Sequence, residues 1–334
     1  VLASTRTNLA PPTAATPAIT AVATTSIAGA WSAPANPAGT VYESQISSNG
    51  FINYFTSSTA LTNATLVDLS TNTAYAFRVR SVLENVLSAW TTLTASTYTL
   101  SATPATGNPS AVDISSATAN WTANTNPTGT IFQVQASTTS FATIAEVIDS
   151  SITQLTQGTM VNLSTNTVHQ MRVRARNGDN LYGSWLALPS TTTKAAPPSV
   201  SATPVSNVYL TSFTVSWSAN NNPAYTSFYI ELSTMDAFSP TTSTWGWNLF
   251  ISTGADFAGL ATGTTYYARA RARNEDLQLT TWTVLASTRT NLAPPVAATP
   301  AITAVATTSI AGAWSAPANP AGTTYESQIS SNGF

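Results

Sequence analysis

The chain has 334 residues, 43% of them hydrophobic and 9% aromatic, which is enough for several packed cores and argues against global disorder. Only 7% of the residues are charged and the net charge is −2, so the composition gives no electrostatic basis for binding nucleic acid or an anionic membrane. There is no cysteine and no apolar run of about 18 residues or more, so the sequence predicts no disulfide, no thiolate metal site and no membrane span.

Internal repetition dominates the chain. Residues 1–51 and 284–334 align at an offset of 283 and differ only at Thr13/Val296 and Val41/Thr324. Tryptophans recur within that distance, at spacings of 90, 96 and 97 residues: Trp31, Trp121, Trp217 and Trp314. A second set keeps step at spacings of 95 and 97: Trp90, Trp185 and Trp282. The unit is therefore about 90–97 residues long, and three units make one super-repeat of 283 residues.

Each unit carries short runs with a period of two. In the first unit a turn at 36–39 follows Trp31, and the run 42–46 then alternates apolar Tyr and Ile with Glu and Gln. The run 72–81 alternates in the same way, so that Tyr75 faces inward while Arg78 and Arg80 face outward. The second and third units repeat both runs, at 132–136 with 166–175 and at 228–232 with 263–272. Alternating, Thr-rich strands between Pro, Asn and Gly turns predict an all-β sandwich.

These residues resemble the pattern of fibronectin type III domains. That pattern has a Trp on the second strand, an aromatic-led third strand and a Leu–x5–Tyr stretch entering the sixth; here it reads Trp31, Tyr42, Leu69, Tyr75, Phe77 and Val79. The tandem arrangement resembles that of bacterial-type secreted or surface repeat proteins. The resemblance implies seven-stranded immunoglobulin-like sandwiches arranged as beads on a string.

The repeats predict the domain boundaries. Residues 1–9 form the last strand of a preceding repeat plus a linker, and three complete repeats follow at 10–101, 102–195 and 196–292. Residues 293–334 copy 10–51 and form the N-terminal part of a further repeat, which stops after its third strand. Pro-Pro pairs or Pro-containing stretches mark the short linkers, which predicts semi-rigid joints.

One group of candidate residues belongs to the core or to its corner. The Trp of each second strand and the residue that leads each sixth strand make up this group: Trp31, Tyr75, Trp121, His169, Trp217, Tyr266 and Trp314. In such sandwiches the leading Tyr places its hydroxyl on nearby backbone. His169, the one histidine of the chain, stands where the other units have Tyr75 and Tyr266, and we expect it to weaken that corner.

A second group is a candidate binding or packing surface. It holds pairs of arginines on the sixth strands and two tryptophans that only the third unit carries: Arg78, Arg80, Arg172, Arg174, Arg269, Arg271, Trp245 and Trp247. Three interpretations of the arginines are open. They could form a stripe that binds an acidic glycan or polyanion, or a face that packs against another chain. They could also form a ladder that pairs with Glu43, Gln45 and Glu231 on the third strands. Trp245 and Trp247 either stack on a sugar or partner, or pack in the core.

No catalytic, cofactor-binding or metal-binding constellation is visible in the sequence. A lone histidine supplies no triad, and the acidic residues form no calcium-loop motif. We therefore expect a non-enzymatic extracellular or cell-surface structural protein, in which copies associate end to end and laterally into a fibre, stalk or filament. Two alternatives stay open: an adhesin or glycan-binding array, and spacer modules of a carbohydrate-active enzyme.

Overall fold

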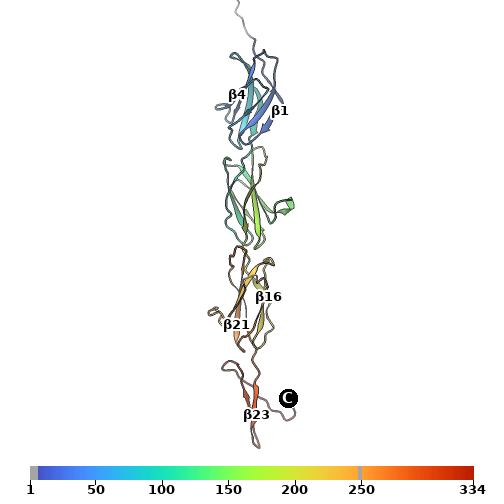
Figure 1. The fold of residues 1–334 in the computed structure, drawn as a ribbon, viewed down its shortest axis with the longest axis vertical. Helices are drawn as coiled ribbons and strands as arrows, with labels where there is room; N and C mark the ends of the chain where they lie inside the picture. The colour runs from blue at the N-terminus through green and yellow to red at the C-terminus, as the bar shows by residue number, and fades with distance from the viewer. Residues whose placement is uncertain (1–6, 247–249) are drawn as a thin grey trace, which may run out of the picture. The chain divides into compact units, whose positions relative to one another are not determined.

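The computed structural model describes residues 7–246 and 250–334, and it is built from antiparallel sheets with one short helical turn, η1 (Ile144–Glu146), in these described parts (Figure 1). Two compact units divide the chain: Val1–Leu163 with Val168–Thr191, and Ser164–Thr167 with Thr192–Phe334. The all-β fold predicted from the alternating runs is confirmed.

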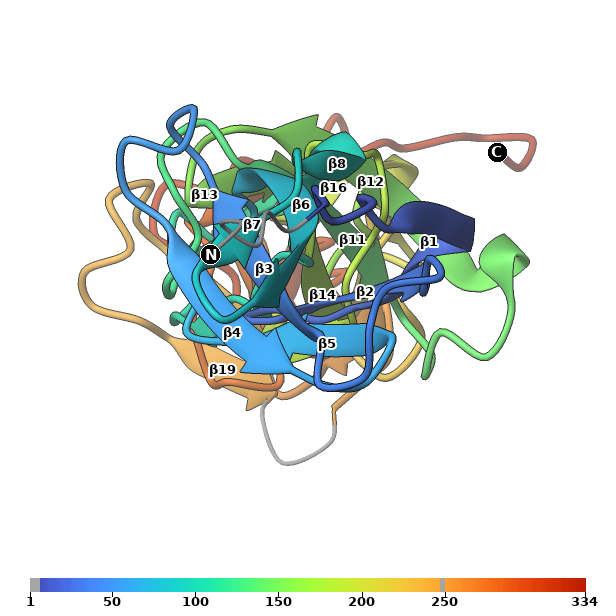
Figure 2. The same ribbon diagram turned by 90° about the horizontal axis from the view of Figure 1, so that it is seen from above.

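The first sandwich lies in unit 1. One sheet has the strand order β1-β2-β5, and the other has the order β4-β3-β6, with β7 and β8 both paired to β6 (Figure 2). The strands are β1 (Thr13–Val22), β2 (Ile27–Ser32), β3 (Val41–Ser47), β4 (Phe55–Thr59), β5 (Asn63–Leu66), β6 (Ala74–Leu83), β7 (Val86–Leu87) and β8 (Thr91–Tyr98).

The second and third sandwiches repeat this topology with seven strands each. Their sheets run β13-β10-β9 with β12-β11-β14-β15, and β16-β17-β20 with β19-β18-β21-β22. The second has β9 (Ala105–Thr106), β10 (Ala117–Thr122), β11 (Ile131–Ser137), β12 (Val147–Thr153), β13 (Gln157–Met160), β14 (Val168–Arg176) and β15 (Leu186–Thr192). The third has β16 (Ser199–Ser206), β17 (Phe213–Ser218), β18 (Ser227–Ser233), β19 (Ser243–Gly246), β20 (Gly254–Phe257), β21 (Thr265–Arg273) and β22 (Thr283–Arg289).

The core of each sandwich surrounds the Trp of its second strand. Trp31, Trp121 and Trp217 are each 3% exposed. Each indole meets the aromatic residue that leads the third strand, with ring centroids 5.7 Å apart for Trp31 and Tyr42 and 5.8 Å apart for Trp217 and Phe228. Such tilted or edge-on contacts are the arrangement that aromatic quadrupoles favour. The tryptophan spacing seen in the sequence therefore marks the centre of each core.

A corner hydrogen bond closes the approach to the sixth strand. The Tyr75 hydroxyl accepts a hydrogen bond from the Ser70 N–H at 2.9 Å, and the Tyr266 hydroxyl accepts one from the Ala261 N–H at 3.0 Å. His169 takes the equivalent place on β14 and is completely buried.

Replacing Tyr75 by Phe removes this bond and leaves the ring in place. We expect the free energy of unfolding of the first sandwich to fall by about 1 kcal/mol, because that is the net contribution of a typical intramolecular hydrogen bond. Hydrogen exchange of β6 measures this, with β21 as the unchanged internal reference. An unchanged exchange rate in β6 would show that the corner bond contributes nothing.

Residues 293–334 depart from two expectations. Their strands are β23 (Val296–Val305) and β24 (Ile310–Ser315), and residues 324–330, which copy β3, form no strand. Trp314, expected in a core, is 43% exposed. In the first sandwich β5 pairs with β2, which carries the equivalent Trp31, and β6 pairs with β3. The buried site of this Trp is therefore made by the later strands.

Candidate functional site

The paired arginines of each sixth strand lie on the outer face of the larger sheet. In β6 the inward residues Phe77 and Val79 are completely buried, while Arg78 and Arg80 are half-buried. As predicted, the third strand pairs with the sixth, which places Gln45 opposite Arg78 and Glu43 opposite Arg80. The register therefore puts an acceptor beside each guanidinium.

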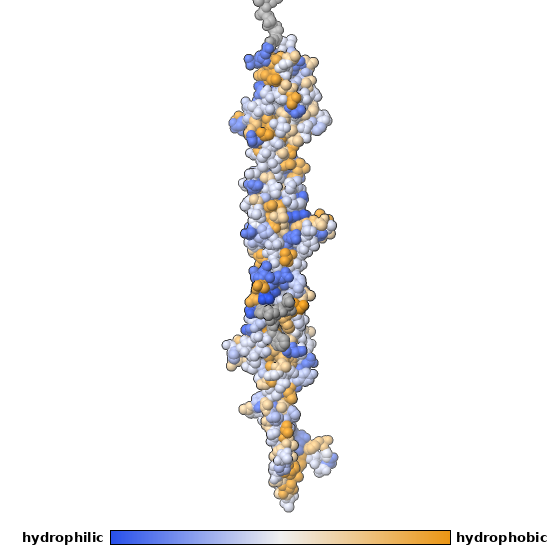
Figure 3. Space-filling model, in the orientation of Figure 1, coloured by the Kyte–Doolittle hydropathy of each residue, from blue (hydrophilic) through white to orange (hydrophobic). Residues whose placement is uncertain are grey.

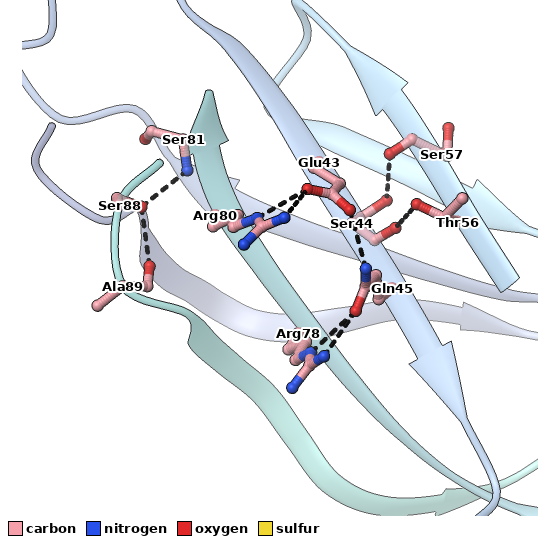
Figure 4. Close-up of polar contacts among 10 residues, drawn as sticks. All are labelled: Glu43, Ser44, Gln45, Thr56, Ser57, Arg78, Arg80, Ser81, Ser88 and Ala89. Carbon is pink, nitrogen blue, oxygen red and sulfur yellow. Dashed lines mark hydrogen bonds and ion pairs between the residues drawn. The ribbon is translucent and has the colours of Figure 1, made fainter. Parts of the chain in front are cut away.

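These four side chains form one hydrogen-bonded row in the first sandwich (Figure 4). Arg78 donates from Nε and Nη2 to Gln45 Oε1, at 3.1 and 2.7 Å. Gln45 in turn donates from Nε2 to Glu43 Oε1 at 2.8 Å. Arg80 donates from Nε and Nη2 to Glu43 Oε2, at 2.7 and 2.6 Å. One carboxylate thus serves both arginines, directly for Arg80 and through an amide for Arg78.

Aromatic rings alternate with the guanidinium groups on the same face. Trp90 lies 4.2 Å from the Arg78 guanidinium carbon and 4.3 Å from that of Arg80, measured to a ring centroid. Phe51 contacts Arg78 from a second ring at 3.7 Å. Arginines two residues apart on a strand are about 7 Å apart, which is room for one ring between them. We call such a row of arginines and rings, with its strand acceptors, the arginine–aromatic ladder.

The second sandwich has the same ladder with different acceptors. Arg172 and Arg174 flank Trp185, each 4.2 Å from the ring, and Phe141 and Tyr182 extend the row at its two ends. Arg172 donates twice to Gln135 Oε1, at 3.0 and 2.7 Å, and Arg174 donates twice to Gln133 Oε1, at 2.9 and 2.7 Å.

The third sandwich again has a carboxylate in the row. Arg269 donates to Glu231 Oε2 from Nε at 2.8 Å and from Nη2 at 2.6 Å, and Trp282 lies 4.3 Å from both Arg269 and Arg271. Phe238 covers the other side of Arg269 at 4.3 Å.

Burial between rings affects the charge of these arginines. The pKa of Arg172 is lowered, first by desolvation and then by the neighbouring positive charge of Arg174. The pKa of Arg78 is lowered in the same order, by desolvation and then by Arg80. Arginine remains charged nonetheless, because the guanidinium group is not deprotonated in proteins. Each ladder is therefore a row of positive groups whose compensation depends on the acceptors of the third strand.

The tryptophans of the ladders were not among the candidates taken from the sequence. In the sequence, Trp90, Trp185 and Trp282 form a periodic set with no assigned site. Each follows the first arginine of its pair by 12 or 13 residues, and this near-constant spacing is the signal that could have placed them in a shared site. Their position over the guanidinium groups follows from the seventh strand lying beside the sixth, as β8 lies beside β6.

The remaining candidates of the third unit are only partly described. Trp247 lies outside the described residues, and the side chain of Trp245 is outside the description as well. The backbone of Trp245 belongs to β19, where it pairs with Ile230 of β18. The roles proposed for the two tryptophans stay predictions.

The described residues hold no group of three or more His, Asp or Glu side chains gathered as metal ligands. No helix in the same residues is long and apolar enough to cross a bilayer. On the face drawn in Figure 3, hydrophobic and hydrophilic residues are interspersed, and residues of intermediate hydropathy cover most of the surface. That surface agrees with the low charged fraction of the sequence.

Comparison with known proteins finds a family match within the third sandwich. Residues 196–285 match the model of the fibronectin type III domain. Among solved structures, the chain is similar to the FN1–FN3 domains of chicken CNTN1, with 16% identity, a TM-score of 0.26, and coverage of 84% of this chain and 100% of that one. It is also similar to a two-domain fibronectin type III segment of chicken tenascin, with 15% identity, a TM-score of 0.39, and coverage of 55% and 100%. No curated protein matches the chain.

Proposed function

We propose that this protein, whose third sandwich is a fibronectin type III domain and whose other two complete sandwiches share its strand order, is a non-enzymatic structural repeat protein. Its sandwiches build a fibre, stalk or surface filament outside the cell. The observation that carries the proposal is the repetition itself: residues 1–51 return at 284–334 with two differences. Super-repeats of this fidelity would present the same surface at the same spacing, which a periodic assembly needs.

Hydrogen bonds between successive sandwiches support a structural role. Within unit 1, Asn72 at the corner of the first sandwich donates from Nδ2 to the Thr130 hydroxyl at 2.9 Å and accepts from the Gly178 N–H at 2.9 Å. Both partners belong to the second sandwich. Asn177 donates back to the Thr99 carbonyl at 3.2 Å. The first two sandwiches are thus joined by side chains as well as by the linker.

The same bonds recur in unit 2. Asn166, within the corner segment Ser164–Thr167, donates to the Thr226 hydroxyl at 2.9 Å and accepts from the Glu275 N–H at 3.0 Å. Arrays of this kind draw their stability from each module and from its contacts with its neighbours. A recurring Asn at the corner is what a chain needs if many modules are to be joined in the same way.

The proposal is tested by the mass and shape of the chain over a concentration series, by light scattering and electron microscopy. We expect growth into ordered filaments that depends only weakly on salt, because the surface carries few charges. A chain that stays monomeric at every concentration would contradict self-assembly. The control is the same series on an Asn72→Ala variant, which weakens one joint and leaves the outer sheet faces unchanged.

A further inference from the structure

The ladder of the second sandwich lacks the carboxylate that the other two possess. In the first sandwich Glu43 accepts from Arg80, and in the third Glu231 accepts from Arg269. At the corresponding positions of β11 the second sandwich has two neutral amides, Gln133 and Gln135. These amides accept the hydrogen bonds of Arg172 and Arg174, but they carry no negative charge to compensate the two guanidinium groups.

The nearby acidic residues of the second sandwich are engaged elsewhere. Glu146 accepts hydrogen bonds from the Thr139 hydroxyl at 2.5 Å and from the Ala142 N–H at 2.7 Å. Asp149 accepts from the N–H groups of Ser150 and Val161, both at 2.8 Å. Arg172 and Arg174, whose side-chain acceptors on the third strand are amides and not carboxylates, form a positive site in a partly desolvated row, where charge interactions are stronger than in water.

The arginines also retain hydrogen-bonding capacity. A guanidinium carries five N–H donors, and the bonds to Gln135 and Gln133 use two on each arginine. The rings of Phe141 and Trp185 cover the faces of Arg172, so the remaining donors lie at its edge. An edge of this kind fits a planar or tetrahedral oxyanion through paired bonds.

A cavity lies at this end of the ladder. It has a volume of about 460 Å³ and is lined, among others, by Ser140, Phe141, Gln170, Arg172, Trp185 and Ser190. The volume is within the range of small-ligand sites, about 300–1,000 Å³. Two hydroxyl groups, an amide and aromatic carbon around one guanidinium are the mixture that a sugar ring with an acidic substituent requires.

We propose that the second sandwich binds the carboxylate or sulfate group of an acidic saccharide at Arg172 and Arg174, with the sugar ring in the adjoining cavity. This binding goes beyond the structural role and does not depend on it. The first and third sandwiches bind such a group weakly or not at all, because the carboxylates of Glu43 and Glu231 already compensate the positive charge of their ladders. The array thus carries one anion site in each set of three sandwiches.

The chain supplies its own matched variants for the test. Gln135→Glu places a carboxylate at the position of Glu231, and Gln133→Glu places one at the position of Glu43. A carboxylate already stands at each of these positions in the first or the third sandwich, so we expect the variants to fold. Thermal unfolding checks this. The probes for the full chain are glucuronate, inorganic sulfate, glucose and a short polyglutamate peptide, followed through the ¹⁵N signals of the Trp185 indole and the arginine Nε groups.

We expect glucuronate to shift these signals saturably and glucose to leave them unchanged. Each variant should weaken glucuronate binding about tenfold or more, as close charge pairs typically do. Three results would overturn the proposal: no shift at saturating glucuronate, equal binding by the folded variants, or equal shifts at Trp90 and Trp282. Binding of polyglutamate or sulfate without glucuronate would replace the saccharide by an acidic peptide or a bare anion.

Discussion

Trp217→Ala is expected to lower the free energy of unfolding of the third sandwich by about 3–5 kcal/mol, the range for removing a buried Trp or Phe side chain. Trp217 is 3% exposed, and its ring lies 5.8 Å from that of Phe228 and 6.3 Å from that of Phe250. Strands of both sheets surround it, so the cavity cannot close without separating them. This loss is a large part of the stability of a domain of this size.

Hydrogen exchange of the full chain measures the loss for each sandwich separately. The amides of β17, β18 and β21 should exchange much faster in the variant, and those of β2 and β3 at their original rate. Trp217→Phe is the matched control, and its effect should be smaller because a ring remains. If the alanine variant lost less than about 1 kcal/mol, the indole would not be the centre of the core.

Trp185→Ala, on the outer face of the second sandwich, is expected to lower the free energy of unfolding of that sandwich by about 2–3 kcal/mol. The ring contacts Arg172 and Arg174 at 4.2 Å each, and a partly desolvated cation–π contact contributes about 0.5–2 kcal/mol. The ring also covers the aliphatic stems of the arginines, which gives a further packing contribution. A half-exposed residue thus contributes nearly as much as a core residue.

The same exchange measurement on β11, β14 and β15 tests this second expectation. Trp185→Phe should retain most of the stability, since a smaller ring still fits between the guanidinium groups. High salt should change the loss only slightly if packing dominates, and strongly if charge does. If Trp185→Ala lowered the free energy of unfolding by less than about 0.5 kcal/mol, the ladder would contribute no more than ordinary surface contacts do.

Much of the fold was predictable because it is written in local periodicity. A period of two assigned Phe77 and Val79 to the core and Arg78 and Arg80 to the outer face, and burial agrees. The pairing of the third and sixth strands followed from the family resemblance, and the register then placed Glu43 opposite Arg80. Trp31 shows the limit of such reasoning, because its burial depends on strands that come later in the chain than its own run.

The ladder could be predicted only in part. Periodicity predicts which face of its own strand a residue occupies. It does not predict which side chains from a neighbouring strand contact that face. Trp90 enters the ladder from outside the run that holds Arg78, so its contact with the guanidinium depends on the packing of β8 against β6. The sequence shows that the second unit has glutamine where the other units have a glutamate. The consequence for charge follows only from the register, which pairs each of these acceptors with an arginine.

By itself, the sequence determined the repeat length, the all-β class, the phase of the strands and the low charge of the surface, because these depend on residue type and spacing alone. Only the tertiary structure decided that rings lie between the arginines, that corner asparagines bond to the following sandwich, and that the positive charge of one ladder is left uncompensated. These features join residues tens of positions apart, and their energies arise from distances of a few ångströms that strand packing alone sets.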